Sequence, residues 1–414
     1  MASLPPPPRP CVSPPVLPYV VALADDLSGA AETACALGGP VRLSLKAADV
    51  AGTAAPHDLV VDLDTRHLPP AEAAHTVRTA LCAAQAGPPR LLYKKVDSQL
   101  RGHLAAEAAA YAEAAEAVVI APALPAARRI VIGGVVHVNG VPLHRTDGWR
   151  AERASAPRSL PEALSALPVR VVPLDVVRSE PAFLEAELRR IAASGAHPAP
   201  DAETDVDLDA VAAAALRLGP GFRLLGSGGL AAALGRALLR PAAAACPPVP
   251  VRDCTPLLFV VGTAEPGAVA QIAHLTALGA HHVPLDPADL AAGTLRLTRT
   301  AAAPALTVLS IDGSAGPRLG AGRALSTALG ALAAAYPGRP DLVLTGGETA
   351  RTTLDALGIT ELEPLGEIHH GAVHSRTPDG RHVVTRPGSH GAEDSLLRIT
   401  AALRPRLAAS AAVT

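Results

Sequence analysis

One ten-residue stretch concentrates many of the reactive groups of this chain. Residues 93–102 read Tyr-Lys-Lys-Val-Asp-Ser-Gln-Leu-Arg-Gly and place two ammonium groups, a carboxylate, a hydroxyl and a guanidinium between an apolar run and a helical run. The chain has 36 basic residues but only three lysines, Lys46, Lys94 and Lys95. Two adjacent lysines in a chain that otherwise uses arginine indicate a compact ammonium that the planar guanidinium fork cannot replace. The stretch predicts an anion site in which Asp97 takes or orients a proton; the simpler interpretation is a solvated basic pair.

Two more polar clusters follow short apolar runs nearer the start of the chain. Asp25 and Asp26 directly follow one run, and Asp64 and Arg66 follow another. Because the ligand crevice of an open parallel sheet lies beyond the carboxyl ends of its strands, we expect these clusters to meet the lysines there. A small anionic substrate would need such a mixture of carboxylates and cations. Each cluster alone is also compatible with a helix cap, since Asp and Ser are preferred N-caps, an alternative that applies most to Ser28 and Asp64.

The elements that must position these clusters follow from periodicity. From residue 19 onward, short β-branched runs alternate with longer alanine-rich runs, which predicts an α/β fold. We expect two domains, each a mostly parallel sheet flanked by helices, over residues 19–240 and 257–405. A proline- and alanine-rich linker is expected over 241–256, a disordered proline-rich tail over 1–18 and a second tail over 406–414. Residues 122–143 and 197–209 are expected to be loops, and 372–375 and 382–385 antiparallel strands.

Composition narrows the function class. The 414 residues carry a formal net charge of −2, which gives no reason to expect nucleic acid or an anionic membrane as a partner. Five scattered cysteines without a CxxC pair indicate neither a disulfide framework nor a zinc site, and a reducing cytoplasm fits best. No run of about eighteen apolar residues that would span a bilayer occurs. The sequence leaves the oligomeric state open, a homo-oligomer included.

Glycine-rich turns in the second half predict nucleotide binding. Residues 262–267, 312–316 and 345–349 each follow an apolar run, and glycine lets backbone N–H groups approach a phosphate at a helix N-terminus. No GxxxxGK[ST] motif occurs, so backbone amides, hydroxyls and arginines must hold the nucleotide. Residues 226–231 resemble a dinucleotide fingerprint, but the next expected strand ends without the acidic residue that NAD requires. His369, His370 and His374 lack the ligand spacing of a metal site.

The sequence resembles the four-carbon acid sugar kinases, which phosphorylate compounds such as erythronate and threonate with ATP. The resemblance runs over residues 20–399 and is carried by residues 24–30 (Ala-Asp-Asp-Leu-Ser-Gly-Ala), 94–102, Pro122–Pro125 with Arg129, 226–231 and 345–349. It implies an N-terminal acid-sugar-binding domain and a C-terminal nucleotide-binding domain.

The resemblance also implies site residues. For the sugar acid these are Asp25, Arg66, Lys95, Val96, Asp97 and Ser98, with Arg101 nearby. We add Asp26, Lys94 and Gly102 as candidates because they belong to the same motifs. For ATP they are Thr263, Gly346, Gly347, Glu348, Thr349 and Gly388, and we add the adjacent Gly262 as a candidate. The chain departs from the family pattern at Thr263, Glu265 and Ala268 and over residues 386–391. An alternative function is therefore a non-catalytic sugar-acid sensor with an impaired ATP site.

The expected reaction moves the γ-phosphoryl group of ATP to a hydroxyl of a short sugar acid, mostly by positioning and charge neutralisation. Arg66 and Arg101 are the expected carboxylate clamps, because guanidinium binds carboxylate bidentately. Lys95 would neutralise charge, and either Asp97 or Asp25 would accept the hydroxyl proton. Mg²⁺ would bridge the phosphates and one carboxylate, whose identity the sequence does not reveal.

Overall fold

The computed structural model describes residues 19–52, 57–86, 90–150, 152, 154–240, 255–263, 266–297, 304–313, 322–388 and 391–407. The predicted tail 1–18, most of the predicted linker and the last seven residues lie outside this part of the chain. So do Glu265, Ser389 and His390, three of the residues at which the chain departs from the family pattern.

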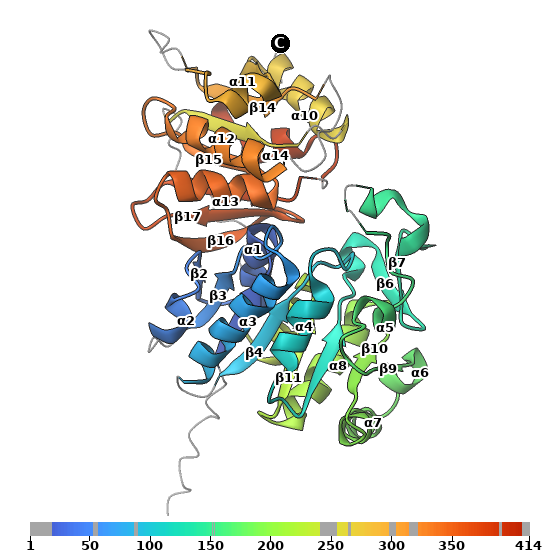
Figure 1. The fold of residues 1–414 in the computed structure, drawn as a ribbon. Helices are drawn as coiled ribbons and strands as arrows, with labels where there is room; N and C mark the ends of the chain where they lie inside the picture. Colours follow the sequence, from blue (N-terminus) through green and yellow to red (C-terminus); the bar gives the residue numbers. More distant parts are fainter. Residues whose placement is uncertain are drawn as a thin grey trace, which may run out of the picture.

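Six parallel strands form the central sheet of the first half of the chain (Figure 1). Its strands run in the spatial order β2 (Val41–Ser44), β3 (Asp58–Asp62), β1 (Val20–Ala24), β4 (Leu91–Lys95), β11 (Phe222–Gly226) and β5 (Ala117–Ala121). Central β1 is buried along its whole length, as expected of a β-branched run covered on both faces. Helices α3 (Pro70–Gln85) and α4 (Leu104–Ala112) pack together, and α9 (Gly228–Ala237) packs with both α1 (Leu27–Leu37) and α8 (Asp205–Leu218).

The region predicted as a loop over 122–143 is instead a small antiparallel sheet. Its strands are β6 (Arg129–Ile132), β7 (Val135–Val138) and β8 (Val141–Pro142). The turns between them have positive φ at Gly133 and Gly134 and again at Asn139 and Gly140. Gly-Gly and Asn-Gly are the residue pairs that two-residue hairpin turns prefer, so the loop prediction missed a local signal.

The predicted acidic surface loop over 197–209 is also wrong. It contains β10 (His197–Pro200), which pairs with β9 (Val169–Val172), and the start of α8. Two of its acids are buried and serve the fold: Asp201 accepts hydrogen bonds from the Gly133 and Gly134 amides, and Asp207 completes a capping box with Thr204. Helices α5 (Leu160–Ala163), α6 (Leu174–Val177) and α7 (Pro181–Ala193) complete this part of the chain.

The second half repeats the pattern with β13 (His281–Leu285), β14 (Leu306–Ile311), β12 (Leu257–Val261), β15 (Asp341–Thr345) and β18 (His382–Arg386), all parallel. The expected antiparallel pairing of β17 (Ala372–Arg376) with β18 is confirmed, and β16 (Glu361–His369) adds to β17. The helices are α10 (Pro266–Ala277), α11 (Pro287–Ala292), α12 (Gly322–Ala334), α13 (Gly347–Ala356) and α14 (Ser395–Leu403). The α/β prediction is confirmed.

The two sheets are joined, which the sequence did not predict. Strand β16 pairs antiparallel with β2 through Glu361–Ser44 and Leu362–Leu43, so the strands form one thirteen-stranded sheet. None of the described helices is both long and apolar enough to cross a membrane. Helix α13 of the second half lies at the carboxyl ends of two strands of the first half: its Arg351 binds Asp62 at the end of β3, and its Gly347 lies against Asp26, which follows β1.

Candidate active site

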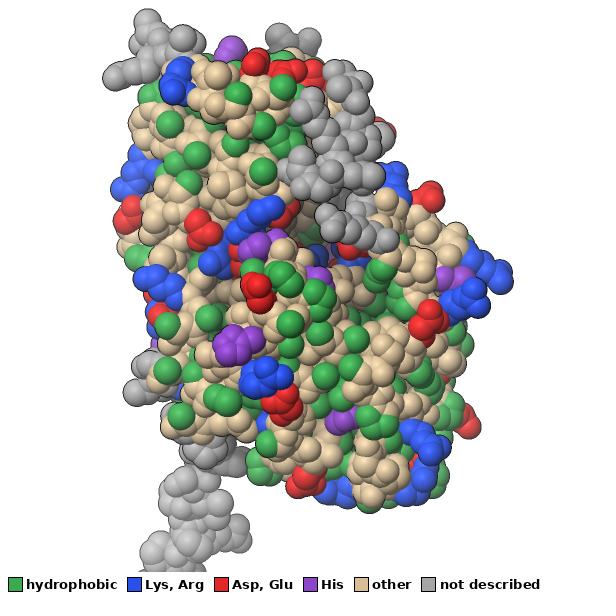
Figure 2. Space-filling view, viewed as in Figure 1, with side chains coloured by type: hydrophobic (Ala, Val, Ile, Leu, Met, Phe, Trp, Pro, Cys, Tyr) green, Lys and Arg blue, Asp and Glu red, His purple; other side chains and the backbone are tan. Residues whose placement is uncertain are grey.

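A cleft of about 240 Å³ lies where the two halves meet. Figure 2 shows basic, acidic and histidine side chains gathered along this boundary. The lining comes from the carboxyl ends of β1 and β4, from helix α1, and from glycine turns and a hairpin tip of the second half. Its members are Asp26, Ser28, Gly29, Glu32, Arg66, Lys95, Asp97, Ser98, Arg101, Leu124, Arg129, Thr263, Gly347, His370, Gly371, Pro387 and Gly388.

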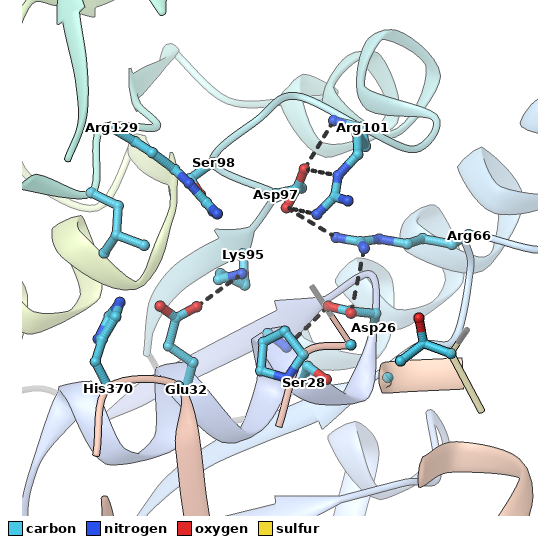
Figure 3. A pocket seen from close by; sticks show the side chains of 17 residues that line it. Asp26, Ser28, Glu32, Arg66, Lys95, Asp97, Ser98, Arg101, Arg129 and His370 are labelled. Carbon is cyan, nitrogen blue, oxygen red and sulfur yellow. Dashed lines mark hydrogen bonds and ion pairs between the residues drawn. The ribbon is translucent and has the colours of Figure 1, made fainter. Parts of the chain in front are cut away.

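Arginines and aspartates form a charge network on one wall of the cleft (Figure 3). Arg66 donates from Nε to Asp25 Oδ2 at 2.7 Å, and its other nitrogens lie 3.4 Å from Asp26 Oδ2 and 3.7 Å from Asp97 Oδ1. Arg101 binds Asp97 bidentately, at 2.7 Å from Nε and 3.0 Å from Nη2. Arg129 donates from Nη1 to Ser98 Oγ at 2.6 Å.

The network divides the aspartates by proton affinity. Burial would raise the pKa of Asp97, but Arg101 and then Arg66 outweigh it and hold that pKa well below its usual range. The pKa of Asp25 is also lowered, because Arg66, Lys94 and Lys95 outweigh burial. At Asp26 burial prevails over Arg66 and raises the pKa.

The two adjacent lysines point to different places because successive side chains of a strand face opposite sides of the sheet. Lys94 is fully buried, and its Nζ lies 2.7 Å from Glu107 Oε2, away from the cleft. Lys95 lines the cleft and lies 3.5 Å from Glu32 Oε2. Of the pair, only Lys95 is placed to meet a ligand in this cleft.

The structure brings nine of the predicted residues to the lining: Asp26, Arg66, Lys95, Asp97, Ser98, Arg101, Thr263, Gly347 and Gly388. The other predicted residues are not part of the lining. Asp25 sits beneath Arg66, and a Cβ at Gly102 would lie 3.5 Å from Asp25 Oδ2. Val96 and Thr349 are buried, and a Cβ at Gly262 would collide with Thr349 Oγ1.

Glu348 and Gly346 flank the lining residue Gly347 but are not part of the lining. Burial raises the pKa of Glu348, with partial compensation from Arg323. Gly346 has φ of +100°, a conformation that suits glycine, and it precedes the first turn of α13.

Helix α13 presents its N-terminus to the cleft. A Cβ at Gly347, its first residue, would lie 2.7 Å from Asp26 Oδ2 and 3.1 Å from Ser28 Oγ, so glycine permits the close approach. Ser28 is 7% exposed, and its hydroxyl has no hydrogen-bond partner among the described residues. Backbone N–H groups at a helix N-terminus together with a buried free hydroxyl favour an anion such as a phosphate.

Several lining residues were missed by the sequence reasoning. Glu32 lies four residues after Ser28 on α1, and residues so spaced share one helix face, so its position was readable once Ser28 was placed. Arg129 was noted only as part of a motif. His370 and Gly371 come from the tip of the β16–β17 hairpin, far along the chain, and no local sequence pattern predicts that they line the cleft.

The glycine-rich turn at residues 226–231 and His374 contribute to the packing of the fold. Ser227 Oγ donates to the Ala123 carbonyl at 2.6 Å and accepts from the Gly229 amide, so the glycines of this turn permit close strand–helix packing.

His374 Nε2 lies 2.9 Å from His382 Nδ1. Among the described residues, no three histidine, cysteine, aspartate or glutamate side chains are arranged so that they could hold a metal ion. Arg386, where the chain begins its last departure from the family pattern, points to Gln271 and Ser395, behind the cleft.

Comparisons with known proteins follow the same division of the chain. Residues 20–234 match the model of a sugar-binding N-terminal domain, and residues 258–396 match that of a nucleotide-binding C-terminal domain. A D-threonate kinase of Cupriavidus necator is 36% identical, over 94% of this chain and 99% of that protein. The chain belongs to the four-carbon acid sugar kinase family.

Two further comparisons are narrower. A D-erythronate kinase of Heliobacterium modesticaldum is 32% identical over 47% of each chain. A crystal structure from Salmonella typhimurium LT2, described as a putative tRNA synthase, shares 22% identity and a TM-score of 0.73 over 92% of this chain and 98% of that one. At that identity the likeness supports the fold alone.

Proposed function

We propose that this family member is an ATP-dependent kinase that phosphorylates a hydroxyl of a four-carbon sugar acid such as threonate or erythronate. The observation that carries the proposal is a cleft in which a cation-rich wall of the sugar-binding half faces the N-terminus of α13 in the nucleotide-binding half. The names of the relatives support the substrate class.

The basic wall suits the carboxylate of a sugar acid. Arg101 and Arg129 line the cleft on either side of Asp97 and Ser98, and guanidinium groups bind carboxylates through two parallel hydrogen bonds. Asp97 holds Arg101 in place through its bidentate contact. In this arrangement Asp97 positions a clamp, a role that its low pKa favours over that of proton acceptor.

The phosphates of ATP would lie at the glycine turns. Thr263, Gly347 and Gly388 line the cleft, and their backbones bring N–H groups close to a ligand. Lys95 lies between these turns and the arginines, where an ammonium would neutralise charge on the phosphoryl group during transfer. The ligands would exclude water from the cleft, which strengthens these interactions.

One carboxylate of the cleft lining could hold Mg²⁺ together with the phosphates of ATP. Mg²⁺ is commonly held by one or two carboxylates together with substrate phosphates and water, so it needs no protein cage. Glu32 lines the cleft with its side chain 20% exposed, and it is the carboxylate that would hold the ion. When bound, the ion would neutralise phosphate charge.

A steady-state assay tests the function. Purified protein is mixed with Mg·ATP and a panel of sugar acids of three to six carbons, and ADP release is followed. Saturable release with a four-carbon acid, absent without it, is expected. Binding of a sugar acid without ADP release would instead support the non-catalytic sensor.

A further inference from the structure

Three neighbouring aspartates compete for the role of proton acceptor, and their surroundings differ. Both Asp97 oxygens accept hydrogen bonds from Arg101, and Arg66 adds a third cationic nitrogen at 3.7 Å. Cations so close stabilise the carboxylate and weaken its affinity for a proton. Asp97 is therefore a poor general base.

Asp25 is excluded by its position as well as its partner. It is 4% exposed, lies outside the cleft lining, and accepts from Arg66 Nε at 2.7 Å. A general base must come within hydrogen-bond reach of the proton that it removes. A ligand in the cleft meets Arg66 before it meets Asp25.

Asp26 lines the cleft and faces both halves of the protein. Its Oδ1 accepts from the Gly29 amide at 3.0 Å and so caps helix α1. Its Oδ2 lies 3.4 Å from Arg66 Nη1, without the bidentate partner that Asp97 has. The same oxygen lies against the first residue of α13, since a Cβ at Gly347 would stand 2.7 Å from it. Lys95 Nζ is also close, 2.6 Å from the position of a Cβ at Gly29.

The surroundings of Asp26 indicate where phosphoryl transfer takes place. The N-terminus of α13 and the buried hydroxyl of Ser28, which has no hydrogen-bond partner in the described part of the chain, converge beside Asp26 Oδ2. A phosphoryl group held by these two donors would place the attacking hydroxyl next to the same carboxylate oxygen. No other carboxylate of the described residues lines the cleft beside the α13 N-terminus in this way.

We propose that Asp26 is the catalytic base, an assignment that rests on the kinase function proposed above. The hydroxyl oxygen of the sugar acid forms a bond to the γ-phosphorus, and its proton passes to Asp26 Oδ2. The bond between the γ-phosphorus and the bridging oxygen breaks, and ADP leaves with that electron pair. Ser28 donates a hydrogen bond to the transferred group.

The charges that face Asp26 suit this role. Arg66, Asp25, Lys95 and Asp97 surround it from the neighbouring strand ends, and burial outweighs the two cations and raises its pKa. From α13 it meets backbone, because Glu348 lies near Gly322 and Arg323. A base whose pKa lies nearer the working pH accepts a proton more effectively.

The test compares Asp26→Asn with two matched variants. Asparagine caps helices as well as aspartate does, so α1 should be retained. Asp286→Asn changes the N-cap of α11, away from the cleft, in the same way and serves as the control. Asp97→Asn separates the arginine-positioning role from the base role. If Asp26→Asn melts early, Asp26→Ser, another good cap without a carboxylate, repeats the comparison.

For Asp26→Asn we expect kcat to fall about a hundredfold or more and the acid limb of the kcat/KM profile to disappear. Dissociation constants for Mg·ATP and the sugar acid, measured by calorimetry, should stay within about threefold of wild type. Asp97→Asn should mainly weaken sugar-acid binding.

Two results would overturn the assignment while leaving the kinase function intact. One is a kcat for Asp26→Asn within about tenfold of wild type. The other is a tenfold or larger rise in the Mg·ATP dissociation constant, which would make Asp26 a nucleotide or metal contact. A wild-type protein inactive with every sugar acid would instead refute the proposed function, and the base assignment with it.

Discussion

Arg323 of the nucleotide-binding half binds Asp64 of the sugar-binding half bidentately, with nitrogen–oxygen distances of 2.7 and 3.1 Å. The two residues are 259 positions apart in the chain, and Asp64 adopts a positive φ of 49° that only a few non-glycine residues tolerate. The contact ties the end of β3 to the start of α12 and thereby helps to hold the cleft together.

A double-mutant cycle measures this tie. We expect Asp64→Asn and Arg323→Gln each to lower the free energy of unfolding, with a coupling of about 1 kcal/mol, because the pair is bidentate but partly exposed. Urea unfolding of the wild type, both single variants and the double variant gives the coupling. Strictly additive effects would mean that the contact adds nothing to stability.

Substitution of Lys94 should lower stability, whereas substitution of Lys95 should lower activity. Lys94→Met leaves the buried Glu107 carboxylate without its cation, and of its partners in the described part of the chain the Thr65 hydroxyl, at 2.9 Å, remains. We therefore expect a loss of roughly 3–5 kcal/mol in stability. Lys95→Met should leave the melting temperature nearly unchanged and lower kcat/KM about a hundredfold or more. Thermal unfolding and the ADP assay, run on both variants, distinguish the two roles. Equal effects on stability would contradict the division.

Acid should destabilise the protein in part through a buried histidine. Burial, and then the neighbouring His382, lowers the pKa of His374 from 6.5 to about 4. The unfolded chain therefore binds a proton below pH 6.5 that the folded chain resists until about pH 4, and stability is lost as the pH falls through that window. At pH 5 the cost is about 2 kcal/mol.

His374→Gln is the matched variant for this pH dependence. Urea unfolding at pH 7.5 and pH 5 should show a smaller acid-induced loss for the variant than for the wild type, whatever its stability at pH 7.5. An unchanged difference between the two pH values would show that His374 titrates as an exposed histidine does.

Gly347 should tolerate a methyl group less well than Gly388. A Cβ at Gly347 would lie 2.7 Å from Asp26 Oδ2, whereas at Gly388 the nearest atom is Thr263 Cβ at 3.4 Å, an ordinary contact. We expect Gly347→Ala to lower kcat/KM by about two orders of magnitude and Gly388→Ala by much less, since small displacements of reacting groups are costly. The reverse order would argue against close apposition of Asp26 and α13.

The sequence predicted the architecture where the signals were local. Alternating β-branched and alanine-rich runs gave β4 and β12 with their observed bounds, and polar residues at strand ends gave Asp26, Arg66 and Lys95 as cleft residues. Strand alternation would also have separated Lys94 from Lys95, had it been applied. Turn chemistry at Asn139 and Gly140 would have predicted the small hairpin sheet.

Contacts between residues far apart in the chain could not be predicted from the sequence. The pairing of β16 with β2 joins residues more than 300 positions apart, and it carries His370 to the cleft wall. The partners within the charge network could not be predicted from the sequence either. The bidentate contact that makes Asp97 a positioning residue was not visible in the sequence, so Asp97 and Asp25 stood as candidate bases while Asp26 did not.

The most direct test of the account follows the phosphoryl group itself. Wild-type protein and Lys95→Met are incubated with Mg²⁺, γ-labelled ATP and D-threonate or D-erythronate, and the products are separated and examined by phosphorus NMR. The account predicts stoichiometric transfer of label to a hydroxyl of the sugar acid by the wild type, and little or none by the variant. Label found only as inorganic phosphate, or retained in ATP while the sugar acid binds, would contradict it.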